Sequence, residues 1–487
     1  MSLDRREFLK ALSAIGVAQA LPLAAHALSQ PTWTRGFDGL SGDQVPLAMQ
    51  LEGDIPKDCF GTLFRNGPAL YERDAQRYAH WFDPDGMIQA FHLSKDGVSH
   101  RGRFVRTRRF VEEEEAGQFL YGGAGTRFPT ETAVRNNETT NVANINVQPF
   151  GDELLALWEA GSAYRIDPET LQTQGQRHWS PDLKGVPFSA HPHFDEQGDM
   201  WNIGSVPWAG GPVVVLYHID RSGELRKSRI QKLDFAGYMH DFVLTPRYLI
   251  ALNSSAVFGE GETFVDRMQW QGDRPSQLLV FDRNDFSLLA VKEVPATFVF
   301  HFGNAWEEGD RLFFTACQHP DSHIVTRGMY LLAQRSVGNF HHQPELVRYA
   351  LSLQQPDVEI TPLGVDMEFP SFDRRRPFAK QPIFGAGGQL SSSSSLATAV
   401  MRVDPENGQA DAYDYGPDVI VEEPIFVPAG QGDGAGYLVH SLLDHKRGRS
   451  GLSLFNAGQI KAGPIAQAWM DRVMPLGFHG CFVAQRA

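Results

Sequence analysis

The sequence predicts an all-β fold, a β-propeller of repeated four-stranded blades around a central axis. Three observations support this class. One strand-and-turn signature recurs along the chain, glycine, proline and aspartate interrupt it frequently, and long helical periodicity is hard to find. The 47 glycines and 30 prolines supply the turns that many short strands need.

The chain begins with a segment that is typical of an export signal rather than of a blade. Arg5–Lys10 is similar to a twin-arginine signal, and a short apolar stretch then ends at the small-residue pattern Ala25–Ala27. We therefore expect residues 1–27 to be a twin-arginine signal peptide and residues 28–487 to form a single propeller domain. The mature protein would be periplasmic and exported folded. An uncleaved amphipathic start is the alternative.

An apolar alternation followed by aspartate and a turn occurs four times, at Asp167, Asp220, Asp282 and Asp404. The separations are 53, 62 and 122 residues, and the last is twice 61. Such spacing is typical of propeller blades and gives about seven of them. The excess residues would form long loops on one face, with 110–141 and 369–398 as candidates. Coincidental strand ends are the alternative, since any all-β protein has aspartate turns.

The composition argues against some classes of function. The net charge of −14 leaves no basic face for nucleic-acid phosphates, so we expect no nucleic-acid partner. The cysteines Cys59, Cys317 and Cys481 are scattered and odd in number, which predicts buried free thiols rather than a disulfide framework. The 33 phenylalanines indicate an apolar interior or an apolar ligand channel, and packing accounts for most of them.

Four histidines lie among apolar or small residues at expected strand starts or ends: His191, His240, His301 and His479. They are 49, 61 and 178 residues apart, so no helix or single loop could bring them together. The inner strands of successive blades all point at the axis of a propeller, where the four could share one ion. A lone histidine is more often structural. Other histidines, such as His319, lie in polar, loop-like sequence.

An all-imidazole site has a restricted metal chemistry. Calcium and magnesium want oxygen ligands, whereas imidazole suits Fe(II), Zn, Cu or Ni. Ligating imidazoles usually donate their other N–H to a carboxylate. Three glutamates in apolar strand sequence could accept such bonds, Glu159, Glu368 and Glu423, although each alone is more often a residue at a surface edge.

Ordered motifs from about Gly53 to the C-terminus resemble the carotenoid cleavage oxygenase family, which is related to the 65 kDa retinal pigment epithelium protein and the lignostilbene dioxygenases. The motifs are Gly61–Pro68, His80–Met87, Leu154–Glu159, Ala190–Pro192, His240–Phe242, Phe300–Ala305, Glu368–Pro370, Glu423–Pro428 and Gly477–Gly480.

The resemblance implies a seven-bladed propeller with a loop and helical dome over a central iron site. It implies that His191, His240, His301 and His479 bind one Fe(II) per chain and that Glu159, Glu368 and Glu423 orient them. With O2 as co-substrate, the implied reaction cleaves a C=C bond of a conjugated chain into two carbonyls. An apolar tunnel would admit a polyene or olefin through a peripheral membrane contact, and a monomer is the family default.

The residue before the first glutamate bears on the substrate. Members that cleave stilbenes generally have a lysine there and a tyrosine upstream, which together deprotonate a hydroxyphenyl group. Here Trp158 precedes Glu159, and residues 122–128 contain no tyrosine. We expect a carotenoid or apocarotenoid substrate, with a lignostilbene or an isoeugenol-like phenylpropenoid as the alternative.

Two functions of another class stay open for a propeller. A non-catalytic binding module would have no reason to keep four buried histidines with matching glutamates. A metal-dependent lactone or ester hydrolase would need an oxygen-rich metal cup. Metal analysis separates the oxygenase, the binding module and the hydrolase.

Overall fold

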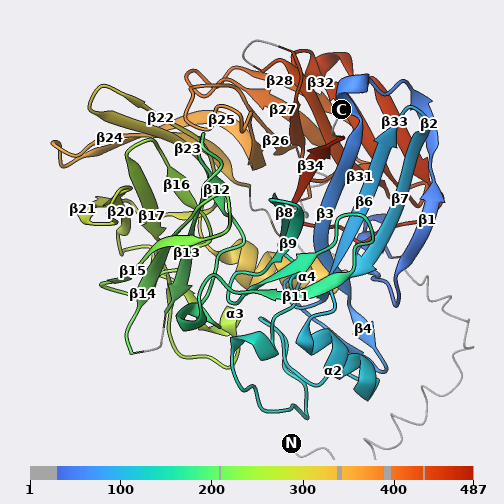
Figure 1. Ribbon diagram of the computed structural model, residues 1–487, viewed down its shortest axis with the longest axis horizontal. Coiled ribbons are helices and arrows are strands. Elements are labelled where there is room, and N and C mark those ends of the chain that lie inside the picture. Colours follow the sequence, from blue (N-terminus) through green and yellow to red (C-terminus); the bar gives the residue numbers. More distant parts are fainter. Residues whose placement is uncertain are drawn as a thin grey trace, which may run out of the picture. The chain divides into compact units, whose positions relative to one another are not determined.

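The computed structural model describes residues 30–207, 210–336, 340, 343–388, 396–430 and 434–485. The expected signal peptide, residues 1–27, lies outside the described residues. The chain from Thr32 to Ala487 forms one compact unit, whose sheets are arranged around a central axis as the blades of a propeller (Figure 1).

The strands of this unit, as far as the chain is described, form seven blades. Blade 1 contains β3 (Gly61–Leu70), β6 (Asp85–Ser94), β7 (Gly97–Phe104), β1 (Gln44–Ala48) and β34 (Gly480–Ala484). Blade 2 contains β8 (Asn146–Phe150), β9 (Glu153–Leu157), β10 (Ala163–Ile166) and β11 (Thr173–Arg177). Blade 3 contains β12 (His193–Phe194), β13 (Met200–Val206), β14 (Val213–Ile219) and β15 (Leu225–Lys232).

Blade 4 contains β16 (Phe242–Leu244), β17 (Tyr248–Asn253), β20 (Ser276–Asp282) and β21 (Leu288–Val294). Blades 5 and 6 share the long strand β25 (Val358–Ser371). Blade 5 adds β22 (Phe298–Glu308), β23 (Arg311–His319) and β24 (Glu345–Ser352), and blade 6 adds β26 (Ile383–Gly387), β27 (Ala399–Val403) and β28 (Ala410–Asp414). Blade 7 contains β29 (Val419–Val421), β30 (Ile425–Pro428), β31 (Gly436–Asp444), β32 (Arg449–Asn456), β33 (Ala466–Met470) and β2 (Gln50–Gly53).

Pairing between the two ends of the chain closes the ring of blades. The last strand, β34, pairs with β3, and the early strand β2 pairs with β33. Strands of neighbouring blades also meet at the axis, where β34 contacts β8, β16 contacts β22 and β30 contacts β34. The axial strands therefore bring residues far apart in the sequence into one place.

The aspartate repeat is confirmed as a feature of the blades. Each of the four aspartates lies at the end of the third strand of its blade or directly after it, in blades 2, 3, 4 and 6. In each turn the carboxylate accepts a backbone N–H two or three residues later, for example from Thr170 to Asp167 at 2.7 Å and from Ser222 to Asp220 at 2.9 Å. An aspartate at this position closes its own turn.

The two predicted loop segments differ in the structure. Residues 110–141 contain most of α2 (Arg108–Ala116) and η3 (Asn137–Thr139), and are otherwise irregular. The prediction that 369–398 is a loop was partly wrong, because β26 lies within it and pairs with β25 and β27. A Cβ on Gly385 of this strand would lie 2.4 Å from Cγ of Met367. The strand uses glycine for close packing.

Helical segments and loops cover one end of the axis. The helices there are α3 (Phe264–Arg267), η5 (Ile324–Gly328) and α4 (Met329–Ala333), and α4 contacts η1 (Thr32–Phe37). The other short helices are η2 (Lys57–Cys59), η4 (Pro181–Leu183) and η6 (Ile460–Ala462). Two short strand pairs, β4 (Glu72–Arg73) with β5 (Gln76–Arg77) and β18 (Ala256–Phe258) with β19 (Met268–Trp270), complete the elements.

One hydrophobic cluster joins these helices to the axial strands. It contains Ile324 and Met329 from the helical cover, Trp81 from a loop, and Phe300 and Phe478 beside two of the four histidines. This cover corresponds to the dome that the family resemblance implied. The three cysteines are buried and free, as expected. Within the described residues, no helix has the length and hydropathy needed to cross a membrane.

Candidate metal centre

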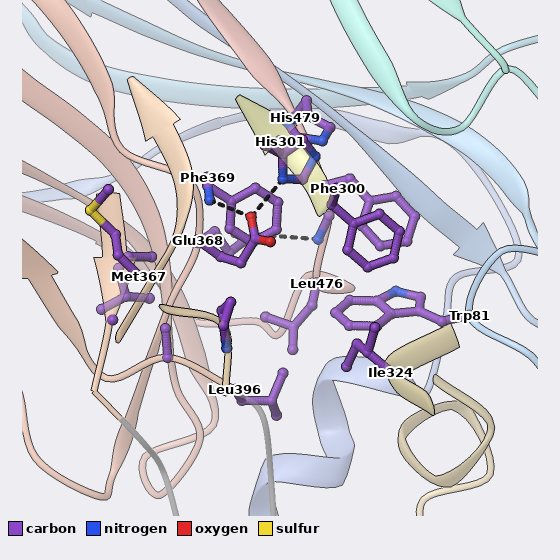
Figure 2. A pocket seen from close by; sticks show the side chains of 18 of the residues that line it. Trp81, Phe300, His301, Ile324, Met367, Glu368, Phe369, Leu396, Leu476 and His479 are labelled. Carbon is purple, nitrogen blue, oxygen red and sulfur yellow. Dashed lines mark hydrogen bonds and ion pairs between the residues drawn. The ribbon is translucent and has the colours of Figure 1, made fainter. Parts of the chain in front are cut away.

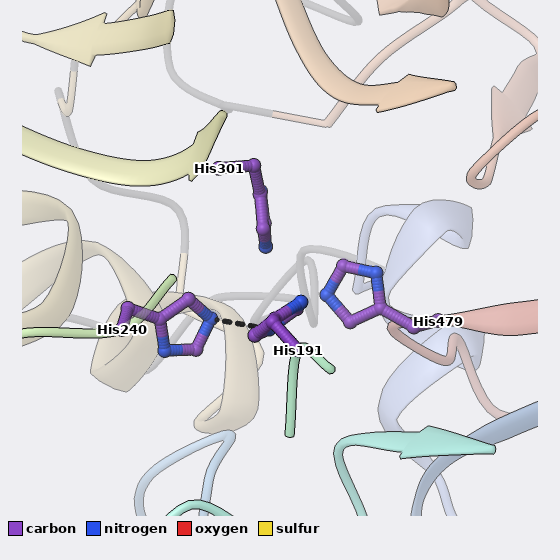
Figure 3. A group of neighbouring side chains, drawn as sticks. All are labelled: His191, His240, His301 and His479. Atoms are coloured by element: carbon purple, nitrogen blue, oxygen red, sulfur yellow. Dashed lines mark hydrogen bonds between the residues drawn. The ribbon is translucent and has the colours of Figure 1, made fainter. Parts of the chain in front are cut away.

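The four histidines come from four different blades and meet at the axis (Figure 3). His191 and His240 stand two residues before β12 and β16, His301 lies within β22, and His479 directly precedes β34. Backbone contacts fix these segments to one another. Ser189 donates its hydroxyl to the His240 carbonyl at 2.7 Å, and the Asn66 N–H donates to the His479 carbonyl at 2.8 Å.

The ring nitrogens of the four side chains converge on one point. One nitrogen from each ring lies within 4.8 Å of those of the others, and all four residues are buried. The Nε2 atoms of His191 and His240 are 2.9 Å apart. The ring centroids of His191 and His240 are 4.4 Å apart, and those of His240 and His301 are 5.3 Å apart.

Three of the four rings are oriented by a carboxylate. His240 Nδ1 lies 2.8 Å from Glu159, His301 Nδ1 lies 2.6 Å from Glu368, and His479 Nδ1 lies 2.9 Å from Glu423. A carboxylate can only accept, so each Nδ1 carries the proton and leaves the lone pair on Nε2. Among the described residues, no carboxylate is hydrogen-bonded to His191.

Glu368 is aimed at His301 by an irregularity in β25. The register between β25 and β26 shifts after Glu368, and Phe369 has a φ of +57°, a left-handed conformation that is rare for a bulky residue. The Phe369 N–H donates to Glu368 Oε2 at 2.9 Å. Strained backbone of this kind persists where the surrounding structure holds it, and it is frequent at functional sites.

Burial and charge act in opposite directions on these rings. Burial lowers the pKa of His191 well below its usual value, and the neighbouring imidazoles lower it further. Burial lowers the pKa of His479 to about 4, although Glu423 opposes the shift. Burial alone would also lower the pKa of His301, but the charge and hydrogen bond of Glu368 outweigh it and raise that pKa.

The cluster fits a first-row metal ion. His301 Nε2 is buried and has no hydrogen-bond partner in the described structure. Lone pairs of His191 and His240 that approach to 2.9 Å repel each other unless a cation or proton lies between them. Four imidazoles without a carboxylate suit Fe(II), Zn, Cu or Ni, and do not suit calcium. These residues do not form the oxygen-rich metal cup that a calcium-dependent hydrolase needs.

Three residues around the centre were not identified from the sequence. The Tyr238 hydroxyl lies 2.9 Å from Glu159 Oε2 and 2.8 Å from His240 Nδ1. Arg65 is 1% exposed and donates to Glu423 at 2.7 Å. His319 was expected in a loop but is the buried last residue of β23, and its Nε2 lies 2.8 Å from Glu368 Oε1.

An apolar cavity of about 130 Å³ adjoins the cluster beneath the helical cover. Figure 2 shows Trp81, Ile324, Leu396 and Leu476 facing it, with His301 and His479 at one side. His240 also lines this cavity, whereas His191 does not. The arrangement places an apolar ligand against the centre.

A larger cavity of about 390 Å³ lies on the Glu159 side. Trp158 and Tyr238 line it, and Phe82 and Ile145 line both cavities. No lysine is among the described residues of its wall. The hydroxyl of Tyr121, the tyrosine just before residues 122–128, is hydrogen-bonded to Glu112 instead of facing this cavity.

The chain is similar to known proteins over most of its length. The model of the retinal pigment epithelial membrane protein family matches residues 41–484. The chain is 30% identical to the apocarotenoid-15,15'-oxygenase of Synechocystis sp., over 93% of this chain and 96% of that one. It is 27% identical to the isoeugenol monooxygenase of Pseudomonas nitroreducens, over 89% and 94%.

A solved structure shares the fold. The crystal structure of the cobalt-substituted Synechocystis apocarotenoid oxygenase superposes with a TM-score of 0.82 at 28% identity, and covers 93% of this chain and 98% of that chain. The fold and the axial histidine cluster define a β-propeller with a buried four-histidine site that fits a metal ion. The chain belongs to the family of the retinal pigment epithelial membrane protein and the carotenoid oxygenases.

Proposed function

We propose that this chain is an Fe(II)-dependent oxygenase that uses O2 to cleave a C=C bond of a carotenoid or apocarotenoid into two carbonyl products. The observation that carries the proposal is the convergence of four buried imidazoles on one point beside an apolar cavity. His191, His240, His301 and His479 would hold one Fe(II) per chain. When bound, the iron would activate O2 for attack on the olefin.

The protein contributes orientation and a dry cavity. Glu159, Glu368 and Glu423 accept a hydrogen bond from the Nδ1–H of their histidines and so keep each Nε2 lone pair directed at the centre. The apolar wall of the smaller cavity holds the olefin and excludes water. Neither a nucleophilic side chain nor a general acid is needed for this role.

Trp158 supports the choice of a polyene substrate. It occupies the wall of the larger cavity next to Glu159, where a lysine could have stabilised a phenolate. A tryptophan and the apolar wall around it suit a hydrocarbon chain instead. An isoeugenol-like phenylpropenoid is the second candidate, because a relative that is 27% identical is an isoeugenol monooxygenase.

Product identification by mass spectrometry tests the proposal. Iron-loaded protein is incubated in air with an apocarotenal, with isoeugenol and with a hydroxystilbene, and His240→Ala protein is the control. We expect shortened polyene aldehydes from the first substrate only. Aromatic aldehydes from isoeugenol or the hydroxystilbene, without polyene aldehydes, would instead assign the enzyme to the phenylpropenoid candidate. Ester or lactone hydrolysis without olefin cleavage would refute the oxygenase.

Export and assembly are part of the same proposal. Residues 1–27 would direct the folded, metal-loaded chain to the periplasm, and the chain would act as a monomer with a peripheral membrane contact. An Arg5→Lys, Arg6→Lys double variant should stay in the cytoplasm at full length, as measured by cell fractionation. Unchanged periplasmic delivery of that variant would contradict the twin-arginine route. Light scattering and vesicle sedimentation test the monomer and the membrane contact.

A further inference from the structure

A third cavity, of about 80 Å³, reaches the histidine cluster along a different wall. His191, His301 and His479 line it, and His240 does not. The apolar cavity has His240 and not His191 in its wall. The cluster therefore lies between two cavities, and each of them has access to a different set of its rings.

The wall of this third cavity is polar and extends to the surface. Arg374 is exposed, and its guanidinium donates to Gln148 Oε1 at 2.8 Å. Gln148 is 2% exposed and donates in turn to Asn146 Oδ1 at 3.1 Å. These hydrogen-bonded side chains lead inward from an exposed residue and line the same cavity as three rings of the cluster.

An imidazole and a carboxylate that do not belong to the cluster stand in this lining. His193 Nε2 lies 2.8 Å from Asp241 Oδ1, and the His193 side chain is 22% exposed. The N–H groups of Phe242 and Phe302 hold Asp241 in place, at 2.7 and 2.9 Å. Because the carboxylate accepts from Nε2, the neutral His193 ring keeps its lone pair on Nδ1, where it can bind a cation.

A divalent cation that crossed the apolar cavity would lose its hydration without compensation, which is strongly unfavourable. The third cavity also has apolar side chains in its wall, but Asn146, Gln148, His193 and Asp241 there offer oxygen and nitrogen donors to a cation. We propose that the metal ion enters and leaves the four-histidine cluster through the polar cavity, with His193 and Asp241 as a transit site. The inference rests on the proposed metal function and concerns the route alone.

A transit residue has a kinetic signature that a ligand does not share. Replacing it slows uptake and release by the same factor, so the equilibrium affinity stays unchanged, whereas loss of a ligand lowers the affinity itself. For His193→Phe, which keeps a ring against Phe242, we expect both rates to fall by about tenfold. His193→Gln keeps a hydrogen bond to Asp241 without a strong metal donor, and should slow both rates as well.

Replacing Arg374 should have the opposite effect on the rate of metal uptake. Its charge stands at the mouth of the cavity and repels an incoming cation. Arg374→Gln keeps a polar side chain and removes the charge, and should speed metal uptake by about threefold to tenfold, most strongly at low salt.

The experiment follows Co(II) uptake by metal-free full-length protein through its visible absorption in a stopped-flow instrument, and iron release to an added chelator. Ile324→Trp, which fills the apolar cavity, is the matched control and should leave both rates unchanged. Wild-type rates in His193→Phe and His193→Gln, or slowed uptake in Ile324→Trp, would overturn the route alone. No metal binding by the wild-type chain would overturn the metal function and the route with it.

Discussion

Replacing Glu423 by glutamine should remove His479 as a metal ligand without removing its side chain. Glu423 Oε1 faces His479 Nδ1 at 2.9 Å, while Oε2 accepts from Arg65 and from the Gly480 N–H, both at 2.7 Å. The glutamine oxygen is expected to take the Oε2 position, because the other orientation would set its NH2 against two donors. The NH2 group then faces His479 and accepts no proton from it.

His479 must change tautomer in that variant. Its Nδ1 would accept from the glutamine NH2, and its Nε2 would carry the proton and lose the lone pair that binds the metal. We expect the metal affinity to fall by about 100-fold, the upper end of the range for such outer partners. Arg65 keeps a hydrogen bond to the amide oxygen but loses a buried charge partner, which should cost about 1–3 kcal/mol of unfolding free energy.

Two other variants make this prediction specific. In Glu159→Gln the amide oxygen can occupy the Oε2 position and still accept from both Tyr238 and His240, so we expect a loss of metal affinity of no more than about tenfold. Glu422→Gln is the matched control, since Glu422 lies 3.8 Å from Arg65 and is not hydrogen-bonded to any of the four histidines in the described structure. Its metal affinity should be that of the wild type.

The assay is competition for the metal with a chromophoric chelator, combined with urea unfolding of the metal-free proteins. Equal affinities for Glu423→Gln and Glu159→Gln would refute the tautomer argument, because that argument depends on which oxygen accepts which donor. Wild-type affinity in Glu423→Gln would refute the role of the glutamate altogether.

His240→Ala should bind no stoichiometric iron and cleave no olefin, as checked by metal analysis and product detection; retained iron with normal turnover would contradict the four-ligand site. His319→Phe removes a donor to Glu368 and should lower the metal affinity by about tenfold, whereas His319→Gln keeps a donor and should lower it less. Gly67→Ala would place a Cβ 2.3 Å from Gly477 Cα and should cost about 1–3 kcal/mol in urea unfolding, and an unchanged midpoint would contradict this packing. Burial lowers the pKa of His80 to about 4 in the folded chain, whereas His80 of the unfolded chain binds a proton at higher pH. The free energy of unfolding should therefore decrease by up to about 3 kcal/mol as pH falls from 6.5 towards 4. In His80→Gln the free energy of unfolding should change less between pH 7 and pH 5 than in the wild type. A change equal to that of the wild type would contradict the role of His80.

The blade repeat could be predicted because each unit carries its own turn signal. The aspartates after the third strands bond to backbone within their own turns, so short stretches of sequence are enough to identify them. Strand β26 was missed for the opposite reason. Its glycines allow close packing against Met367, and this contact exists only when the strands are paired, so the local sequence does not indicate it.

The histidines and their glutamates were found because each lies in a motif with a recognisable local context. The partners that stabilise them were not assigned a role, although Arg65 lies within the motif Gly61–Pro68. Arg65 and Glu423 are 358 residues apart, and His319 meets Glu368 because β23 pairs with β22 so that His319 stands opposite Phe298, three residues before His301. Contacts of this range follow from closure of the ring and strand register, which no single segment specifies.

The most direct test of the central claim is to count metal and turnover in one preparation. Iron per chain and the rate of olefin cleavage are measured for the wild type, for alanine variants of the four histidines taken singly, and for Glu422→Gln. We predict one iron per chain and cleavage in the wild type and in Glu422→Gln, and loss of both in every histidine variant. Full iron content and turnover in any of the four alanine variants would contradict the claim that these histidines form the catalytic metal centre.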